Sequence, residues 1–259
     1  KGVNPISSMT SKTLISGAKM MGGVSASLLT EVKNGYLTFE DFTTIAAEGD
    51  EETKAIFGQL RAIYGGKFDK RFGTGETVSW EGKITLIAGA THAIHKTRQL
   101  FSNMGERFLC YNIDTPDREE ATLRTMKNHE GDLSGFRRNM QSSLKSLMDV
   151  ELVQKFPTDL PKLTDEFRGN IVRVAEFVTR ARSTVERDMR SPQKDIVEVH
   201  PPEMPTRFAA QMQKISEATM VLNHYNHGGD AQMRPEDFEM LYKFCFDSIP
   251  GKKRKVLQV

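Results

Sequence analysis

Features typical of secreted and membrane proteins are scarce in this sequence. Its 259 residues include two cysteines. Cys110 and Cys245 lie far apart in apolar surroundings, without the spacing of a metal site. No apolar run approaches the roughly 20 residues that cross a bilayer, and no signal peptide opens the chain. We therefore expect no membrane partner, no disulfide, and a cytoplasmic protein with buried thiols.

A large excess of charge is also missing. The formal net charge is +2, which is too small to indicate a nucleic-acid-binding protein unless the cations form a local patch. One such patch is Lys252-Lys253-Arg254-Lys255, for which targeting, a DNA contact and solvated cations on a terminal helix all remain open. With 38% hydrophobic and 27% charged residues, the chain can form one large domain or two small ones.

Motifs of several common enzyme classes are absent. The sequence has no Gly-x-Ser-x-Gly turn for a nucleophilic serine, and neither cysteine has a histidine near it in the sequence. The pairs His92/His95 and His224/His227 lack the further glutamate or cysteine ligands of a zinc site. We expect both pairs to lie on helix surfaces or loops.

The phosphate-binding loop Gly-x-x-x-x-Gly-Lys-Ser/Thr is absent as well. The segment from Gly89 to Thr97 imitates it, but Ile94 stands where the second glycine belongs and the Lys-Thr pair comes one residue late. Residues 1–259 therefore do not contain the loop that cradles nucleotide phosphates in P-loop proteins.

The pattern of apolar residues predicts an α/β part followed by an α-helical part, with a boundary near Pro116. The expected organisation is a partial α/β core (1–116), a helical segment (117–190), a proline-rich linker (191–205) and a helical C-terminal part (206–259). Within the core we expect a helix at Glu51 to Tyr64, a hairpin with a Gly73-Thr74-Gly75 turn inside Gly65 to Gly82, and a buried parallel strand at Ile84 to Ala90. A further strand is expected at Phe108 to Ile113. Helices are expected at 117–127, 133–152, 163–189, 206–222 and 234–248.

The stretch from Tyr36 to Thr44 carries the main indication of chemistry. Leu37 and Phe39 alternate toward a core, and Glu40 and Asp41 follow at the carboxyl end of the strand, where ligands bind in open α/β sheets. Two carboxylates in this place indicate a magnesium-phosphate site. The alternative is a strand followed by an ordinary acidic turn.

Several motifs in order resemble the later half of an AAA+ ATPase core, of the minichromosome-maintenance-like branch. They are the acid-ending strand at Asp41, a helix, a glycine-turn hairpin, an apolar strand ending at Gly89-Ala90-Thr91, and Gly105-Glu106-Arg107-Phe108. The chain is also similar to AAA+ proteins of phages and mobile elements in the phrases at 40–45, 58–66 and 105–109. The resemblance spans nearly the whole chain and implies a partial parallel-sheet core with a C-terminal helical lid, binding ATP and Mg²⁺.

The resemblance gives roles to residues of the core. Asp41 matches the Walker B acid that holds magnesium. The glutamate that polarises water usually follows this aspartate, but Phe42 occupies that position and Glu40 precedes it, so either Glu40 substitutes or hydrolysis is slow. Thr91 matches the sensor 1 residue that reads the γ-phosphate, and helix capping is its alternative.

Two arginines complete the implied catalytic set. Arg107 matches the arginine finger that enters a neighbouring subunit's site, which implies a homo-oligomeric ring; pairing with Glu106 or a surface acid is the alternative. Arg207 looks like the sensor 2 arginine, through which the lid binds the nucleotide.

The hairpin is implied to contact DNA. Lys67, Lys70 and Arg71 interleave with Phe68 and Phe72, which supplies cations for phosphates and aromatic rings for stacking. The alternative is a basic edge strand that prevents aggregation.

Under this resemblance we expect the phosphate loop to lie upstream of Lys1, so that the chain is a fragment that is inactive alone. The parent protein would be an ATP-driven motor or switch acting on DNA or a nucleoprotein complex. Two other interpretations stay open: a catalytically inactive AAA+-like adaptor that binds DNA or a protein partner, and an unrelated helical binding module.

Overall fold

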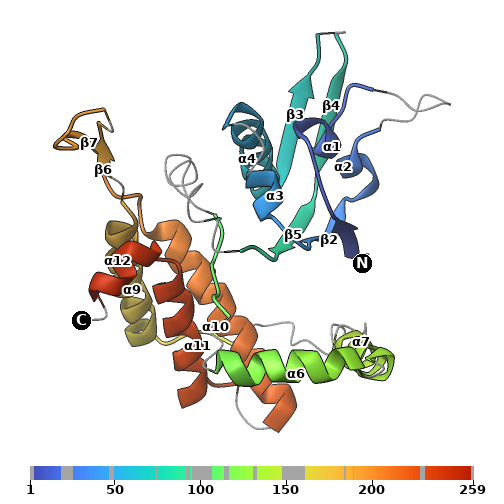
Figure 1. The fold of residues 1–259 in the computed structure, drawn as a ribbon, viewed down its shortest axis with the longest axis vertical. Coiled ribbons are helices and arrows are strands. Elements are labelled where there is room, and N and C mark those ends of the chain that lie inside the picture. Colours follow the sequence, from blue (N-terminus) through green and yellow to red (C-terminus); the bar gives the residue numbers. More distant parts are fainter. Residues whose placement is uncertain are drawn as a thin grey trace. The chain divides into compact units, whose positions relative to one another are not determined.

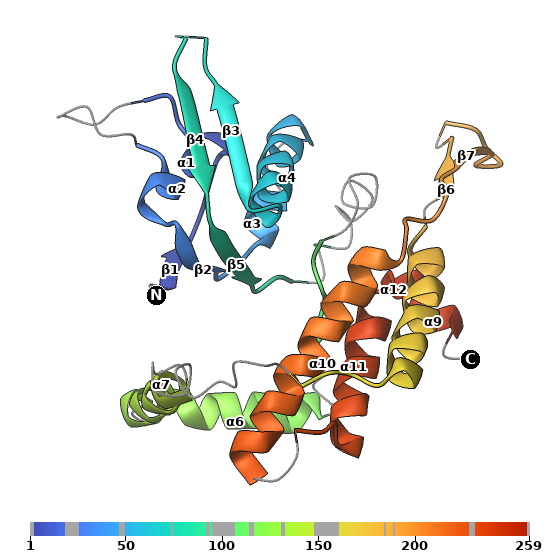
Figure 2. The same ribbon diagram turned by 180° about the vertical axis from the view of Figure 1, so that it is seen from behind.

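The computed structural model describes residues 3–18, 26–46, 50–73, 75–91, 94, 107–113, 117–130, 133–147, 161–183, 185–188, 190–227 and 231–257. They form a mixed α/β protein with a small parallel sheet, two hairpins and a set of helices (Figures 1 and 2). The chain divides into two units, one of Lys1–Phe108, Thr179–Glu203 and Pro250–Val259 and the other of Leu109–Val178 and Met204–Ile249.

The sheet of the first unit has the strand order β1-β2-β5, and all of its pairs are parallel. These strands are β1 (Val3–Ile6), β2 (Asn34–Phe39) and β5 (Lys83–Ala88). Both strands predicted for this region, at 36–39 and 84–90, are confirmed, and they are neighbours in the sheet. β5 is less buried than its apolar sequence predicts, since Ile87 is 56% exposed.

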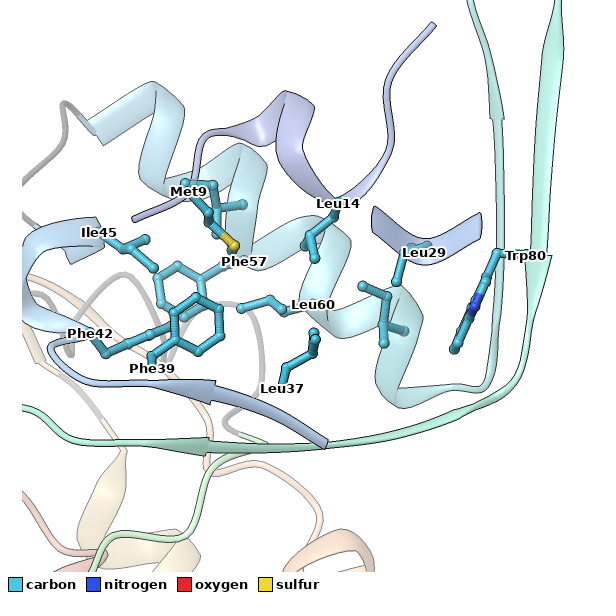
Figure 3. Packing of buried hydrophobic residues seen from close by; sticks show 12 residues of the cluster. Met9, Leu14, Leu29, Leu37, Phe39, Phe42, Ile45, Phe57, Leu60 and Trp80 are labelled. Atoms are coloured by element: carbon cyan, nitrogen blue, oxygen red, sulfur yellow. The ribbon is translucent and has the colours of Figure 1, made fainter. Parts of the chain in front are cut away.

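The core of this unit lies between β2 and helix α4 (Asp50–Tyr64). Figure 3 shows Leu37 and Phe39 from the strand against Phe57 and Leu60 from the helix. Phe42 joins them through edge-to-face contacts, with ring centroids 5.3 Å from Phe39 and 5.6 Å from Phe57. Each fully buried side chain of this size contributes roughly 1.5–3 kcal/mol. The short helices α1 (Ser11–Leu14), α2 (Leu28–Glu31) and α3 (Thr43–Ala46) complete this part of the unit.

The predicted hairpin is confirmed as an antiparallel pair, β3 (Lys67–Arg71) with β4 (Thr77–Glu81). Its turn includes Gly75, whose φ of 85° is readily adopted only by glycine. The hairpin is anchored at the opposite end by Trp80, which is buried and donates its indole N–H to the carbonyl oxygen of Val32 at 3.0 Å.

The remaining elements of the first unit come from the later sequence. They are the hairpin β6 (Val185–Arg187) with β7 (Ile196–Val199), and helix α12 (Gly251–Leu257). Arg182 precedes this hairpin in the sequence and Glu203 follows it, and the two side chains form an ion pair with 3.1 Å between the charged atoms. The Arg182 side chain is 5% exposed. Lys253 of α12 donates to the carbonyl oxygen of Ser183.

The second unit is helical. It contains α6 (Arg118–Glu130), α7 (Ser134–Leu147), α10 (Thr206–His227), α11 (Pro235–Asp247) and α9 (Asp165–Arg182) up to Val178. Helices α10 and α11 pack together around Met212 and Cys245, whose sulfur atoms are 3.6 Å apart. Phe167 of α9 contacts Phe238 of α11 edge to face at 5.4 Å.

Three expectations were wrong. Residues 108–113 form no strand; the Asn112 N–H donates to the Asp247 carboxylate instead of to a sheet. The helix expected to run to Met189 ends at Arg182, and β6 follows it. The expected linker at 191–205 contains β7, because the β-branched run Ile196–Val199 pairs with β6 between the flanking prolines. The part of the predicted helix at 148–152 lies outside the described residues.

In the described part of the chain, every helix is too short or too polar to traverse a lipid bilayer.

Gly82 provides a test of the hairpin junction. A Cβ atom there would lie 1.9 Å from the carbonyl oxygen of Lys33 and 2.8 Å from the Trp80 ring, so Gly82→Ala should lower the free energy of unfolding by roughly 2–4 kcal/mol. Urea unfolding followed by the fluorescence of Trp80, the protein's one tryptophan, measures this. The control is Gly58→Ala in α4, where nothing lies within 4 Å of the added Cβ; it should stabilise by up to about 1 kcal/mol. Equal urea midpoints for Gly82→Ala and Gly58→Ala would show that position 82 is not closely packed against Lys33 and Trp80.

Asp247 should make the second unit sensitive to acid. Burial alone would raise the pKa of this carboxyl group, but hydrogen bonds from the Asn112 N–H and the Lys243 ammonium outweigh burial, and the pKa is lowered. A lowered pKa means that the ionised form stabilises the fold above the unfolded-state pKa of about 3.9, and that this contribution is lost as the pH falls through the folded-state pKa.

We therefore expect Asp247→Asn to reduce the free energy of unfolding by roughly 1–3 kcal/mol at neutral pH, and the difference from the natural protein to shrink below about pH 4. Urea unfolding followed by circular dichroism across this pH range tests the prediction. Glu239→Gln, an exposed carboxylate on the same helix, should change little. If the difference in the free energy of unfolding between Asp247→Asn and the natural protein stays constant with pH, Asp247 does not stabilise the fold through its ionised form.

Candidate functional site

The carboxyl ends of β2 and β5 meet at a close backbone junction. The N–H of Gly89 donates to the carbonyl oxygen of Phe39 at 2.9 Å, and the N–H of Phe42 donates to the carbonyl oxygen of Gly89 at 2.8 Å. A Cβ atom at Gly89 would lie 2.6 Å from the carbonyl oxygen of Glu40. The strands can therefore approach this closely only with glycine at this position.

This junction brings Asp41 and Thr91 to one place through Thr43. Asp41 Oδ1 accepts the backbone N–H of Thr43 at 2.9 Å, which fixes the carboxylate at the start of α3 in the manner of a helix cap. The hydroxyl of Thr43 accepts the N–H of Thr91 at 2.9 Å and lies 3.1 Å from the Thr91 hydroxyl. Two residues that the resemblance assigns to one site, fifty positions apart in sequence, thus contact the same threonine, Asp41 through the threonine's backbone N–H and Thr91 through its hydroxyl.

Glu40 and Phe42 flank this aspartate in opposite environments. Glu40 is exposed, as is Asp41. Phe42 is 5% exposed, and its ring packs among Phe39, Phe57 and Phe108. The position that the resembled family gives to a catalytic glutamate is therefore part of the hydrophobic core, and Glu40 is the second carboxylate that faces solvent here.

The donor set at this edge fits magnesium. Asp41 and Glu40 supply exposed carboxylate oxygens, and Mg²⁺ in proteins is commonly held by one or two carboxylates together with water and phosphate oxygens. The hydroxyl groups of Thr43 and Thr91, which are 3.1 Å apart, add neutral hydrogen-bonding groups at the same junction. Asp41 is the residue that would hold the metal, with Glu40 as the neighbouring exposed carboxylate. The loop that would hold the phosphates is not in residues 1–259.

Arg107 belongs to the same unit and contacts the end of α4. Its neighbour Phe108 packs on Phe42 and Phe57, with ring centroids 5.9 Å and 6.2 Å away. The guanidinium of Arg107 lies over the ring of Tyr64, at the end of α4, with its central carbon 5.8 Å from the ring centroid. In one chain it therefore stacks on this tyrosine.

Arg207 lies in the second unit, in the first turn of α10, and is half-buried. It belongs to a different unit from Asp41 and Thr91. The residues of the predicted site are therefore divided, with Asp41, Glu40, Thr91 and Arg107 on the first unit and Arg207 on the second.

The hairpin cations do not share one face. Lys70 is half-buried with its ammonium 5.3 Å from the centroid of the Phe72 ring, whereas Lys67 and Arg71 are exposed on the alternate positions of β3. Lys67 lies 3.9 Å from the carboxylate of Asp69 and opposite Glu81 in the register. Acidic neighbours therefore offset Lys67. Lys70 interacts electrostatically with Glu52, and Arg71 is exposed at the end of β3 next to the turn.

Of the two histidine pairs in the sequence, only the second is described. His92, His95 and the Lys96-Thr97 pair lie outside the described residues. His224 and His227 are exposed on α10, as predicted. Elsewhere the imidazole of His200 lies between the carboxylates of Glu186 and Glu198, at 3.7 and 3.6 Å. These three metal-type ligands gather on the β6–β7 hairpin, where the histidine bridges two glutamates that oppose each other across the strands.

Sequence reasoning missed Thr43 and Gly89, which hold the site together. A signal for Thr43 was present, since a threonine two residues after an aspartate at a strand end is a capping pattern. Gly89 gave no comparable signal, because the need for glycine arises from a carbonyl group about fifty residues earlier.

No protein-family model matches the chain, and no curated protein matches it either. The interpretation of this site therefore depends on its own residues and geometry.

Proposed function

We propose that the chain is part of an AAA+ ATP-hydrolysing motor or switch that acts on DNA or a nucleoprotein complex. One observation carries the proposal: Asp41 and Thr91, at the ends of neighbouring parallel strands, are joined by hydrogen bonds through Thr43. Ligands of open α/β sheets bind at the carboxyl ends of the strands, and in P-loop NTPases an aspartate of the Walker B motif helps to hold the magnesium ion.

The side chains have distinct roles in this proposal. Asp41 holds the metal, Thr43 orients Asp41 and Thr91, and the Thr91 hydroxyl binds the γ-phosphate or the attacking water. Mg²⁺ and ATP, when bound, would supply charge neutralisation and the phosphoryl group. Glu40 is the candidate for the base, because it is the exposed carboxylate beside Asp41.

The arginines would act between chains and between units. Arg107 would enter a neighbouring subunit's site in a ring and neutralise charge in the transition state. Arg207, at the start of α10, would connect the helical unit to the γ-phosphate as a lid. The phosphate loop that this mechanism requires must come from outside residues 1–259.

A second candidate function is an inactive AAA+-like adaptor that holds DNA or a protein partner. Phe42 favours it, because a core phenylalanine at 5% exposure stands where the family keeps its catalytic glutamate. The two candidate functions differ only in whether ATP is hydrolysed, so a measurement of ATP hydrolysis distinguishes them.

Asp41→Asn is the sharpest test of the motor. Asparagine can still accept the Thr43 N–H, so the turn should survive, but the charge that holds magnesium is lost. In a form of the protein extended upstream through a native phosphate loop, we expect magnesium-dependent ATP hydrolysis to fall at least about a hundredfold. The control is Glu51→Gln, an exposed acid in α4, with unchanged turnover.

Unchanged hydrolysis in Asp41→Asn would contradict the metal role. Hydrolysis absent from the unmodified extended protein, with or without DNA, would favour the adaptor.

The hairpin gives an independent test. Lys70→Glu with Arg71→Glu should weaken binding to a fluorescent single-stranded or duplex DNA. The slope of log affinity against log salt concentration should decrease by about 1.4 to 1.8, as expected for two lost phosphate contacts. Lys67→Glu is the control and should have the smaller effect, because Asp69 and Glu81 already offset this lysine. Equal slopes in the double variant and the natural protein would remove the hairpin from the DNA site.

A further inference from the structure

The two strands of the β6–β7 hairpin (Figure 1) bring two glutamates and a histidine together on one face. Glu186 of β6 lies directly opposite Glu198 of β7 in the antiparallel register, so both side chains project from the same side of the hairpin. His200 comes two residues after Glu198 and continues that side. One ligand atom from each of the three side chains forms a group in which all atoms lie within 4.8 Å of one another.

The two carboxylates repel each other in this position, because like charges directly opposite on two strands destabilise their pairing. Within the part of the chain that the structure describes, His200 is the only ion-pair partner of either glutamate. Its imidazole nitrogens lie 3.7 Å from the Glu186 carboxylate and 3.6 Å from the Glu198 carboxylate. Both distances exceed the length of an N–H···O hydrogen bond, about 2.7–3.2 Å, so the ring lies between the carboxylates without a hydrogen bond to either.

Little burial of apolar surface holds this hairpin together. Ile196, Val197 and Val199 are 56%, 63% and 63% exposed, and an irregularity interrupts the strand pairing between Glu186 and Arg187. A two-stranded hairpin is at best marginally stable in water by itself. A cation bound between the strands would therefore remove the repulsion and add a link that the apolar residues do not supply.

Two carboxylates and one imidazole suit a divalent transition metal. Zn²⁺ binds histidine nitrogen and carboxylate oxygen at about 2.0–2.2 Å, so two ligands of a tetrahedral zinc ion lie about 3.3–3.6 Å apart. The two N···O distances are close to this separation. One ring nitrogen binds the ion, and the glutamate beside the other nitrogen reaches it by rotation, since both glutamate side chains are about 60% exposed.

The charge and the type of the ligands also distinguish between metals. Two carboxylates balance the charge of a divalent ion. Mg²⁺ and Ca²⁺ prefer sites made of oxygen ligands, whereas an imidazole suits zinc and its neighbours in the first transition series.

We propose that Glu186, Glu198 and His200 form a binding site for a divalent transition metal such as Zn²⁺, which joins β6 to β7. Three protein ligands leave a coordination position for water. The ion pair between Arg182 and Glu203 joins the residues just outside the hairpin, so the metal would be a second connection between its strands. None of these residues belongs to the candidate phosphate site, and the inference is independent of the proposed ATPase function.

Isothermal titration calorimetry with ZnCl₂ tests the site on the full chain at roughly 50 µM, above a micromolar dissociation constant. Excess Mg²⁺ is present to occupy sites made of oxygen ligands alone. The natural chain should bind one more equivalent of zinc than His200→Gln, and Glu186→Gln should bind this equivalent at least about tenfold more weakly. The control His224→Gln with His227→Gln should keep it, because these histidines lie on α10.

A natural chain that binds no zinc under these conditions overturns the proposal. Equal zinc binding by the natural chain and by His200→Gln also overturns it, because the metal would then be held elsewhere.

Digestion with trypsin tests whether the metal joins the strands. Arg190 and Lys194 are exposed between β6 and β7, where trypsin cleaves more readily when the hairpin opens. Zinc should slow cleavage after these two residues several-fold in the natural chain, because it binds only the closed hairpin, and should have no effect in His200→Gln. Mass spectrometry identifies the fragments, and cleavage after Lys127, exposed on α6, is the internal control. Cleavage after Arg190 and Lys194 that zinc leaves unchanged in the natural chain overturns the proposed link.

Discussion

The candidate site depends on the close approach of Gly89 to the end of β2. Hydrogen bonds from Gly89 to Phe39 and from Phe42 to Gly89 hold the two strands together at their carboxyl ends, and the position tolerates no Cβ. The approach sets where Thr91 meets Thr43, and Thr43 sets where Asp41 points. The pairing of the two strands and the hydrogen bonds that follow it therefore fix the positions of the Asp41 carboxylate and of the hydroxyl groups of Thr43 and Thr91.

The same junction explains why the residue after Asp41 is a phenylalanine. The N–H of Phe42 completes the strand junction, and its ring fills the space between β2, α4 and Phe108. A glutamate there would place a carboxylate in an apolar core at a cost of several kcal/mol. The fold therefore uses this position for stability, and in the proposed ATPase the base is another residue, for which Glu40 is the candidate.

Local sequence patterns predicted most of the regular structure. Alternating apolar residues predicted β2, apolar residues at helical spacing predicted α4, α10 and α11, and the glycine turn predicted the β3–β4 hairpin. Each of these patterns is contained in one short segment. The sequence also indicated Asp41 and Thr91 as partners, through the motif order of a family. It did not indicate Gly89, whose role comes from a carbonyl group about fifty residues earlier. Thr43 was missed although a threonine two residues after Asp41 is a capping pattern. The β6–β7 hairpin was missed because prolines dominated the interpretation of residues 191–205, although Ile196–Val199 had a strand composition.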